Sequence, residues 1–311
     1  MNIISNDKIS NKINKHLVIV DLDGTLLNKD FSTLNQENKK VLQKLKAAGH
    51  KVCIATGRNY NSAVSFYKEI GLDTLLITYN GAYIISPDQK ENKSITIPIS
   101  NPIVKDILNE EIVKKNLLNF MVDSVDRETI STSDDIYYRE IFFNGNPYKK
   151  GDVLELLGGK DCLQLVLEFP AGEKKENGKR DSRNFDLIIS TLRKKYKSSI
   201  TFYCGTKLKA EKEGDKILVP DEERMIIKIR NLNSNKGEAA KLVAGYYNIS
   251  LNDTVAFGND INDIEMMSKV GVGVAVSNSE NNLKAYVHDI TEFDSHQGGV
   301  AKYLSDFFEL E

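Results

Sequence analysis

Two aspartates, Asp21 and Asp23, lie two residues apart in the segment Asp-Leu-Asp-Gly-Thr-Leu, directly after the apolar run 16–20. Ligands of open α/β sheets bind at the carboxyl ends of the strands, so two carboxylates there can flank one reacting centre. Asp21 can bind a hard cation and attack phosphorus. Asp23 can act as a general acid and later help to activate water. Taken alone, the segment could also be a loop with two solvated aspartates.

A second polar segment, Thr56-Gly57-Arg58, follows the apolar run 51–56 and precedes a stretch with helical spacing. A hydroxyl group together with the free N–H groups of a helix N-terminus makes an anion site. An ordinary helix N-cap would explain the same residues. Their position after another strand of the same predicted sheet favours the anion site.

Two further segments complete the set. Lys236 precedes a predicted helix, where its ammonium group could neutralise both Asp21 and a bound phosphate. The segment 258–263, Gly-Asn-Asp-Ile-Asn-Asp, follows the apolar run 254–257 and offers the oxygen ligands that Mg²⁺ prefers. Each segment alone also suits a surface lysine or a polar turn. Together the four segments supply the parts of a phosphoryl-transfer site.

The elements that must position these residues follow an alternating pattern. The predicted strands are 16–20, 51–56, 74–79, 254–258 and 272–276. The predicted helices are 35–48, a helix ending near Ile70, 236–247, 261–269, 280–287 and 299–308. This alternation predicts a doubly wound, Rossmann-like α/β core with a parallel sheet.

Residues 86–230 interrupt the alternation and are predicted to form an inserted α+β domain. Its predicted strands are 94–99, 163–169, 199–203 and 225–229, and its predicted helices are 102–118 and 185–196. The predicted division is therefore a flexible N-terminal extension (1–15), a core (16–85 and 231–311) and the insert (86–230).

Composition limits the possible partners. The 311 residues are 41% hydrophobic and 28% charged, with a net charge of −2, so no strong basic field is available for nucleic acid or an anionic membrane. Three cysteines without metal-ligand spacing indicate no disulfide framework. No apolar signal core or membrane-length run is present. We expect a cytoplasmic protein that is a monomer or a weak homodimer.

These motifs resemble those of the haloacid dehalogenase-like superfamily of hydrolases, and more narrowly the Cof-like sugar-phosphate phosphatases. The resemblance covers roughly 16–85 and 225–308. The matching segments are Asp21 to Leu26, Ala55 to Arg58, Lys236-Gly237 and Phe257 to Met266, with the subfamily signature Asn80-Gly81-Ala82 and the tail from Asp294 to Tyr303.

The resemblance implies a role for each matched residue. Asp21 would be the nucleophile and a Mg²⁺ ligand, and Asp23 the acid/base, with its backbone carbonyl on the metal. The phosphate would be held by Leu22, Thr56, Gly57, Lys236 and Asn262. Independently of the resemblance, Arg58 is a candidate substrate contact. The insert would be a cap domain that closes over the site and carries the specificity contacts.

One position departs from the family pattern. The family usually has Gly-Asp in the fourth motif, whereas this chain has Gly258-Asn259. Asn259 would therefore stand where a metal-binding carboxylate is expected, and its amide oxygen can bind Mg²⁺ without contributing charge. Asp260 and Asp263 are the candidates for the missing carboxylate, either directly or through water.

The favoured hypothesis is a Mg²⁺-dependent phosphatase that hydrolyses small phosphate esters, such as sugar phosphates, through an aspartyl phosphate on Asp21. A phosphomutase would keep the same aspartate pair but would re-bind its bisphosphate intermediate. A third hypothesis is a catalytically weakened regulatory protein that binds phosphate esters, with Asn259 as the mark of lost activity. Phosphate release separates the first hypothesis from the other two.

Overall fold

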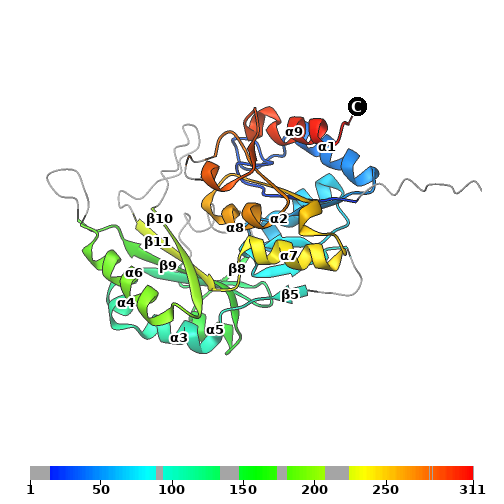
Figure 1. The fold of residues 1–311 in the computed structure, drawn as a ribbon. Helices are drawn as coiled ribbons and strands as arrows, with labels where there is room; N and C mark the ends of the chain where they lie inside the picture. Colours follow the sequence, from blue (N-terminus) through cyan, green and yellow to red (C-terminus); the bar gives the residue numbers. More distant parts are fainter. Residues whose placement is uncertain are drawn as a thin grey trace, which may run out of the picture.

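The computed structural model describes residues 15–88, 94–133, 147–173, 181–206, 224–279, 281 and 283–310. Figure 1 shows two lobes, each built around its own sheet. Apart from Lys15, the predicted N-terminal extension lies outside the described residues.

The first lobe contains a five-stranded parallel sheet. Its strands follow the order β14 (Asp289–Ile290), β13 (Val272–Ala275), β12 (Thr254–Gly258), β1 (Leu17–Val20) and β2 (Lys51–Ile54). A parallel bridge from Ala55 to Ile77 places β3 (Leu76–Thr78) beyond β2. The predicted doubly wound α/β fold is thereby confirmed.

Helices cover both faces of this parallel sheet because successive strand residues point to opposite sides. Val18 and Val20 belong to the apolar cluster formed with α1 (Gln36–Ala47), α2 (Tyr60–Ile70) and α9 (Gly299–Phe307). Leu17 and Ile19 belong to the cluster formed with α7 (Lys236–Tyr246) and α8 (Ile264–Lys269). The strands are therefore buried on both sides, and their carboxyl ends face the second lobe.

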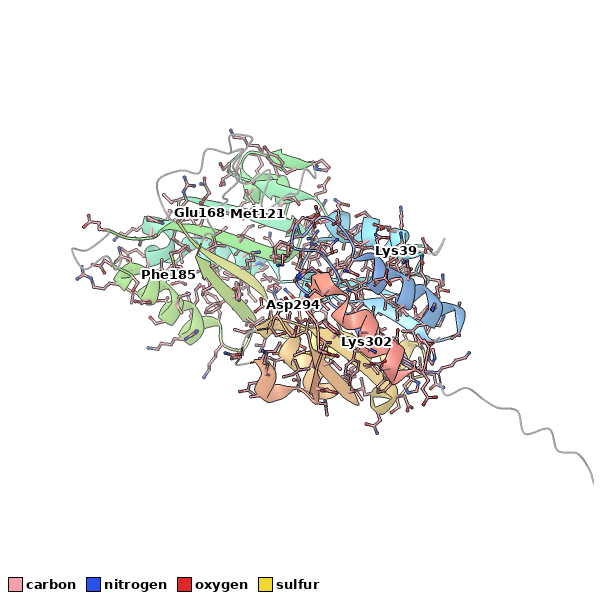
Figure 2. The ribbon with its side chains drawn as sticks, turned by 90° about the horizontal axis from the view of Figure 1, so that it is seen from above. Lys39, Met121, Glu168, Phe185, Asp294 and Lys302 are labelled. Carbon is pink, nitrogen blue, oxygen red and sulfur yellow. The ribbon has the colours of Figure 1, made fainter. Side chains whose placement is uncertain are left out.

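The second lobe contains a six-stranded sheet. Its strands follow the order β10 (Ile200–Thr206), β11 (Arg224–Asn231), β9 (Cys162–Pro170), β6 (Asn119–Ser124), β7 (Thr129–Ser131) and β8 (Tyr148–Lys150). One face packs against α3 (Asn101–Asn109), α4 (Glu111–Asn116), α5 (Val153–Leu157) and α6 (Arg183–Tyr196). Phe185 lies on the helical layer and Met121 and Glu168 on the sheet (Figure 2).

Several predicted elements differ from those observed. The predicted helix 102–118 is two helices, because Glu110 between them has a non-helical ψ of 126°. The predicted helix 280–287 is a 3₁₀ turn over Leu283–Tyr286. The predicted strand 94–99 is β5 (Ser94–Thr96), which pairs with β4 (Tyr83–Ile85) in a small sheet with β3. The exact division into core and insert stays a prediction.

Two features of the described residues bear on the compositional predictions. Cys53, Cys162 and Cys204 are free thiols, in agreement with the expected absence of a disulfide framework. None of the helices in the described part of the chain combines the length and apolar character needed to cross a lipid bilayer.

Candidate active site

The predicted site residues converge at the carboxyl edge of the parallel sheet. Asp21 follows β1, Thr56 lies beyond β2, and Asn259 follows β12, and these three strands are neighbours in the sheet. The backbone N–H of Asp21 donates to the carbonyl of Phe257 at 3.1 Å, which joins the loop after β1 to strand β12. Lys236 begins α7 and points into the same region.

The ammonium group of Lys236 lies between two carboxylates. Its Nζ donates to Asp21 Oδ1 and to Asp263 Oδ1, at 2.6 Å in each case. Lys236 and Asp263 are fully buried, and Asp21 is nearly so. Burial raises the pKa of the Asp21 carboxyl to about 8, against the opposing effect of Lys236 and with a contribution from Asp263. Asp21 and Asp263 together offer two carboxylates to the single ammonium group of Lys236, which favours an additional positive charge here.

A second ion pair holds Asp23. Arg58 donates from Nε to Asp23 Oδ2 at 2.8 Å and from Nη2 to Asp23 Oδ1 at 2.5 Å, a bidentate arrangement. The same Nη2 also donates to the carbonyl of Phe31. Because both oxygens of Asp23 accept from Arg58, an acid role requires one oxygen to turn toward the leaving group. Arg58 is thus placed to orient Asp23, while its predicted substrate contact stays a prediction.

Asn259 packs directly against the turn that carries the two aspartates. A side chain at Gly24 would bring its Cβ within 2.3 Å of Asn259 Nδ2, and Gly24 has a φ of +71°, so only glycine suits this turn. The hydroxyl group of Thr25 donates to Asn259 Oδ1 at 3.3 Å. These contacts place the side chain of Asn259 against the residues that follow Asp23, on the cavity that Asp21 and Asp23 also line, where the family resemblance expects a metal ligand.

The two acidic residues after Asn259 occupy different environments. Asp263 Oδ2 accepts from the backbone N–H groups of Asn259 and Asp260, at 3.0 and 3.2 Å. Because Oδ1 accepts from Lys236, both carboxylate oxygens of Asp263 are occupied by hydrogen bonds within the protein. Asp260 lies on the wall of the cavity described below. The geometry therefore favours Asp260 over Asp263 as an additional metal ligand.

The donor set fits Mg²⁺. In the described part of the chain, no group of three or more His, Cys, Asp or Glu side chains is arranged to hold a metal ion. Mg²⁺ needs only one or two carboxylates and otherwise binds neutral oxygens and water. Asp21, the backbone carbonyl of Asp23 and the amide of Asn259 are such donors, and the excess of buried carboxylates favours a cation.

Three of the predicted phosphate-binding residues, Thr56, Gly57 and Asn262, adjoin Asn80. Asn262 Nδ2 donates to Asn80 Oδ1 at 2.7 Å, and a Cβ on Gly57 would lie 3.1 Å from Asn80 Nδ2. Thr56 is buried, and its hydroxyl group accepts from the N–H of Arg58 at 3.1 Å. The side chain of Leu22 lies in the apolar core, so only its backbone can face a ligand.

Asn80 reaches this position through an unusual backbone. Tyr79 and Asn80 have φ values of 50° and 53°, in the left-handed region that non-glycine residues seldom adopt. Two hydrogen bonds of 2.9 Å hold the turn, from Tyr79 N to the carbonyl of Arg58 and from Asn80 N to the carbonyl of Thr56. Such strain is concentrated at functional sites, and here it directs Asn80 toward the predicted phosphate site.

A cavity of about 660 Å³ opens over these residues and is lined by both lobes. The predicted residues on its wall are Asp21, Asp23, Gly57, Arg58, Asn259, Asp260 and Asn262. The remaining predicted residues, Leu22, Thr56, Lys236 and Asp263, lie buried behind that wall. The volume is in the range of metabolite-binding clefts.

The second lobe supplies a wall that the sequence analysis did not identify. Polar side chains from four strands line the cavity on this side: Asp123, Gln164, Thr201, Lys228 and Arg230. In β11, Lys228 and Arg230 alternate with Ile227 and Ile229, which pack against the helices. This period of two was visible in the sequence, but it does not tell which face meets the other lobe.

The charged side chains on this wall interact in part with other groups of the second lobe. Burial raises the pKa of Asp123 to about 6, while the hydroxyl group of Thr129, which donates to it at 2.5 Å, and nearby Lys228 act in the opposite direction. Burial likewise lowers the pKa of Arg230 to about 10. Arg230 Nη1 donates to the carbonyl of Ser234 at 3.1 Å and to that of Asn80 at 3.4 Å, which links the two lobes at the site.

Comparison with known proteins agrees with this architecture. A family model described as haloacid dehalogenase-like hydrolase matches residues 18–304. The solved structure of TM0651 from Thermotoga maritima superposes with a TM-score of 0.72 at 22% identity, covering 94% of this chain and 97% of that protein. At this level of identity the match establishes the shared fold.

Two relatives from Bacillus subtilis match over nearly the whole chain. The 5-amino-6-(5-phospho-D-ribitylamino)uracil phosphatase YitU is 27% identical over 300 residues, which is 95% of this chain and 98% of that protein. Phosphatase YwpJ is 24% identical over 310 residues, which is 93% of this chain and 98% of that protein. The similarity therefore includes both lobes.

Proposed function

The chain belongs to the haloacid dehalogenase-like hydrolase family, and we propose that it is a Mg²⁺-dependent phosphatase of small phosphorylated metabolites, such as sugar phosphates. The observation that carries this proposal is the contact of Lys236 with Asp21, at 2.6 Å, beneath a cavity that Asp23 also lines. The names of the phosphatase relatives support the same reaction class.

In the proposed reaction a carboxylate oxygen of Asp21 attacks the phosphorus atom in line with the ester oxygen. The ester P–O bond breaks, and the leaving oxygen takes a proton from Asp23. Water then attacks the phosphorus of the aspartyl phosphate and gives a proton to Asp23, which releases inorganic phosphate and restores the carboxylate of Asp21. Throughout, the ammonium group of Lys236 neutralises charge next to Asp21.

Asp21, the carbonyl of Asp23 and Asn259 would hold Mg²⁺, with Asp260 as a further direct or water-mediated ligand. When bound, the ion would offset the charge of the phosphate group and of the buried carboxylates. Gly57 and Asn262 line the cavity on the side of Asn80, which supports their proposed role in holding the phosphate oxygens.

The Asp21→Asn substitution tests the proposed nucleophile. Asparagine keeps the shape of the side chain but cannot form the acyl phosphate, so kcat should fall by about 10⁴-fold or more. The measurement is release of inorganic phosphate in the presence of Mg²⁺. Asp306→Asn, a surface change on α9, is the matched control and should retain full activity. Turnover at the wild-type level by Asp21→Asn would exclude the mechanism.

A screen of phosphorylated metabolites tests the reaction class. It should include hexose and pentose phosphates and 5-amino-6-(5-phospho-D-ribitylamino)uracil, the compound in the name of YitU. We expect release of free phosphate without isomerised product, because water is the acceptor. Formation of an isomeric phosphate instead would identify a mutase, and binding without turnover would identify a regulatory protein.

A further inference from the structure

Phe31 is an aromatic residue held in an exposed position beside the site. Its side chain is 54% exposed, and its φ of 52° lies in the left-handed region, which costs on the order of 1 kcal/mol for a non-glycine residue. The short loop that carries it is closed by the bridge between Leu27 and Leu34 and by a 2.9 Å hydrogen bond from Asn28 N to the carbonyl of Thr33. The loop is thus closed by backbone pairing, and it exposes the ring of Phe31 to solvent.

The same loop is fixed to the catalytic machinery. The main-chain carbonyl of Phe31 accepts from Arg58 Nη2, and this guanidinium group also binds both oxygens of Asp23. Phe31 lines the same cavity as Asp21 and Asp23. The backbone that carries the ring is therefore tied, through Arg58, to the proposed acid Asp23.

The second lobe places another exposed ring on the cavity. Tyr203 is 49% exposed, lies on β10 and pairs across the sheet with Lys228, which lines the cavity as well. Exposed aromatic rings at a ligand cavity offer large, rigid surfaces that stack on planar groups. Within the part of the chain that the structure describes, each lobe thus places an exposed aromatic ring on the cavity.

We propose that Phe31 and Tyr203 bind a planar ring in the leaving group of the substrate, so that the enzyme prefers phosphate esters carrying such a ring beyond the ester carbon chain. This inference rests on the proposed phosphatase function and adds a substrate class to it. Stacking on aromatic side chains should raise kcat/KM by roughly tenfold or more over a ligand without the ring. Phe31 and Tyr203 are then residues that determine specificity.

The test compares two phosphate esters with the same reacting group. Adenosine 5′-monophosphate and ribose 5-phosphate both release the primary 5′-hydroxyl group of ribose, and only the former carries a planar base. We expect wild-type kcat/KM to be at least about tenfold higher for the nucleotide. The ratio should fall several-fold in Phe31→Ala and in Tyr203→Ala, and Phe31→Tyr, which keeps a ring, should retain it.

The matched control is Tyr246→Ala, because Tyr246 is also 49% exposed but lies on α7 and does not line the cavity. Its nucleotide preference should equal that of the wild type. Equal kcat/KM values for the two esters in the wild type, or an unchanged preference in both alanine variants, would overturn the inference.

Ligand binding separates this inference from the proposed function. Dissociation constants of the two esters are measured with Asp21→Asn, which needs no turnover. If the wild type hydrolyses neither ester nor an aryl phosphate, the phosphatase proposal fails, while tighter binding of the nucleotide still supports the aromatic site. If hydrolysis occurs and the two dissociation constants are equal, the phosphatase proposal stands and the aromatic site is rejected.

Discussion

Lys236 is fully buried, and its charge is shared by Asp21 and Asp263. Replacing it with methionine keeps most of the volume but leaves two buried carboxylates without a cation. We expect Lys236→Met to lower the free energy of unfolding by about 3–5 kcal/mol at neutral pH. Urea denaturation measures this change.

Lys241→Met is the control for this substitution, because Lys241 is an exposed residue of the same helix. Its effect should stay within about 0.5 kcal/mol. A loss of stability in Lys236→Met no larger than that of the control would show that the buried ion pairs do not stabilise the fold.

Asn259 offers a second test at the scale of one residue. Asn259→Asp is nearly isosteric and adds a negative charge next to Gly24, on the cavity that Asp21 also lines. If Asn259 is a metal ligand, the Mg²⁺ concentration for half-maximal activity should fall by about tenfold or more. Asn252→Asp, an exposed change before β12, should leave that concentration unchanged. An unchanged or raised Mg²⁺ requirement in Asn259→Asp would exclude Asn259 as a ligand.

From the sequence, the site residues at the carboxyl edge of the core sheet could be predicted, whereas the other residues that line the cavity could not. Asp21, Thr56 and Asn259 each follow an apolar strand, and the common edge of parallel strands is enough to bring them together. Phe31 and Asp123 carry no comparable signal. Their place at the site depends on a loop conformation and on how the lobes meet, neither of which local residue spacing specifies.

At the scale of elements, the amino end of β1 meets the carboxyl end of α9 through a cluster of rings. His16 N donates to His50 Nδ1 at 3.1 Å, and the rings of His50 and Phe308 are centred 4.6 Å apart. Burial, and in addition the nearby His16, lowers the pKa of His50 below its ordinary value of 6.5. The ring therefore remains neutral in the folded protein at pH values where it is protonated in the unfolded chain.

This difference predicts how stability depends on pH. As pH falls below about 6.5, the unfolded chain binds a proton at His50 before the folded protein does, so this residue's contribution favours unfolding. His50→Asn keeps a hydrogen-bond acceptor but does not titrate. The free energy of unfolding, measured between about pH 5 and 7, should vary less steeply with pH in this variant. Equal slopes in the two proteins would refute the assignment to His50.

Element boundaries show where tertiary contacts override local pattern. Apolar residues continue at helical spacing through 102–118, so the sequence predicts one helix. In the structure the chain breaks at Glu110, whose carboxylate accepts from Tyr196 and Lys195 of α6. Strand β6 was not predicted. One of its faces carries Asn119, Met121 and Asp123, and Phe120 and Val122 on the other face pack in the cluster with the helices.

At the scale of the whole molecule, each lobe has its own main apolar cluster, and Leu163 of β9 in the second lobe joins the cluster of the first. The clusters of the core sheet draw on residues from both ends of the described chain, whereas the cluster of the six-stranded sheet lies within 99–229. The change in alternation near residues 86 and 236 is the signal on which the predicted division into core and insert rests, and that division stays a prediction. The relative placement of the lobes could not be predicted, since it depends on contacts such as those of Arg230.

The two segments that connect the lobes lie side by side. Asn231, on the return strand, donates from Nδ2 to the carbonyl of Pro98 on the outgoing segment at 2.8 Å. An inserted lobe whose first and last segments lie next to each other can be lengthened, shortened or exchanged without shifting the strand register of the core sheet. Over evolutionary time, a lineage built in this way can acquire new metabolites as substrates by altering one lobe, while the reactive aspartate is inherited unchanged.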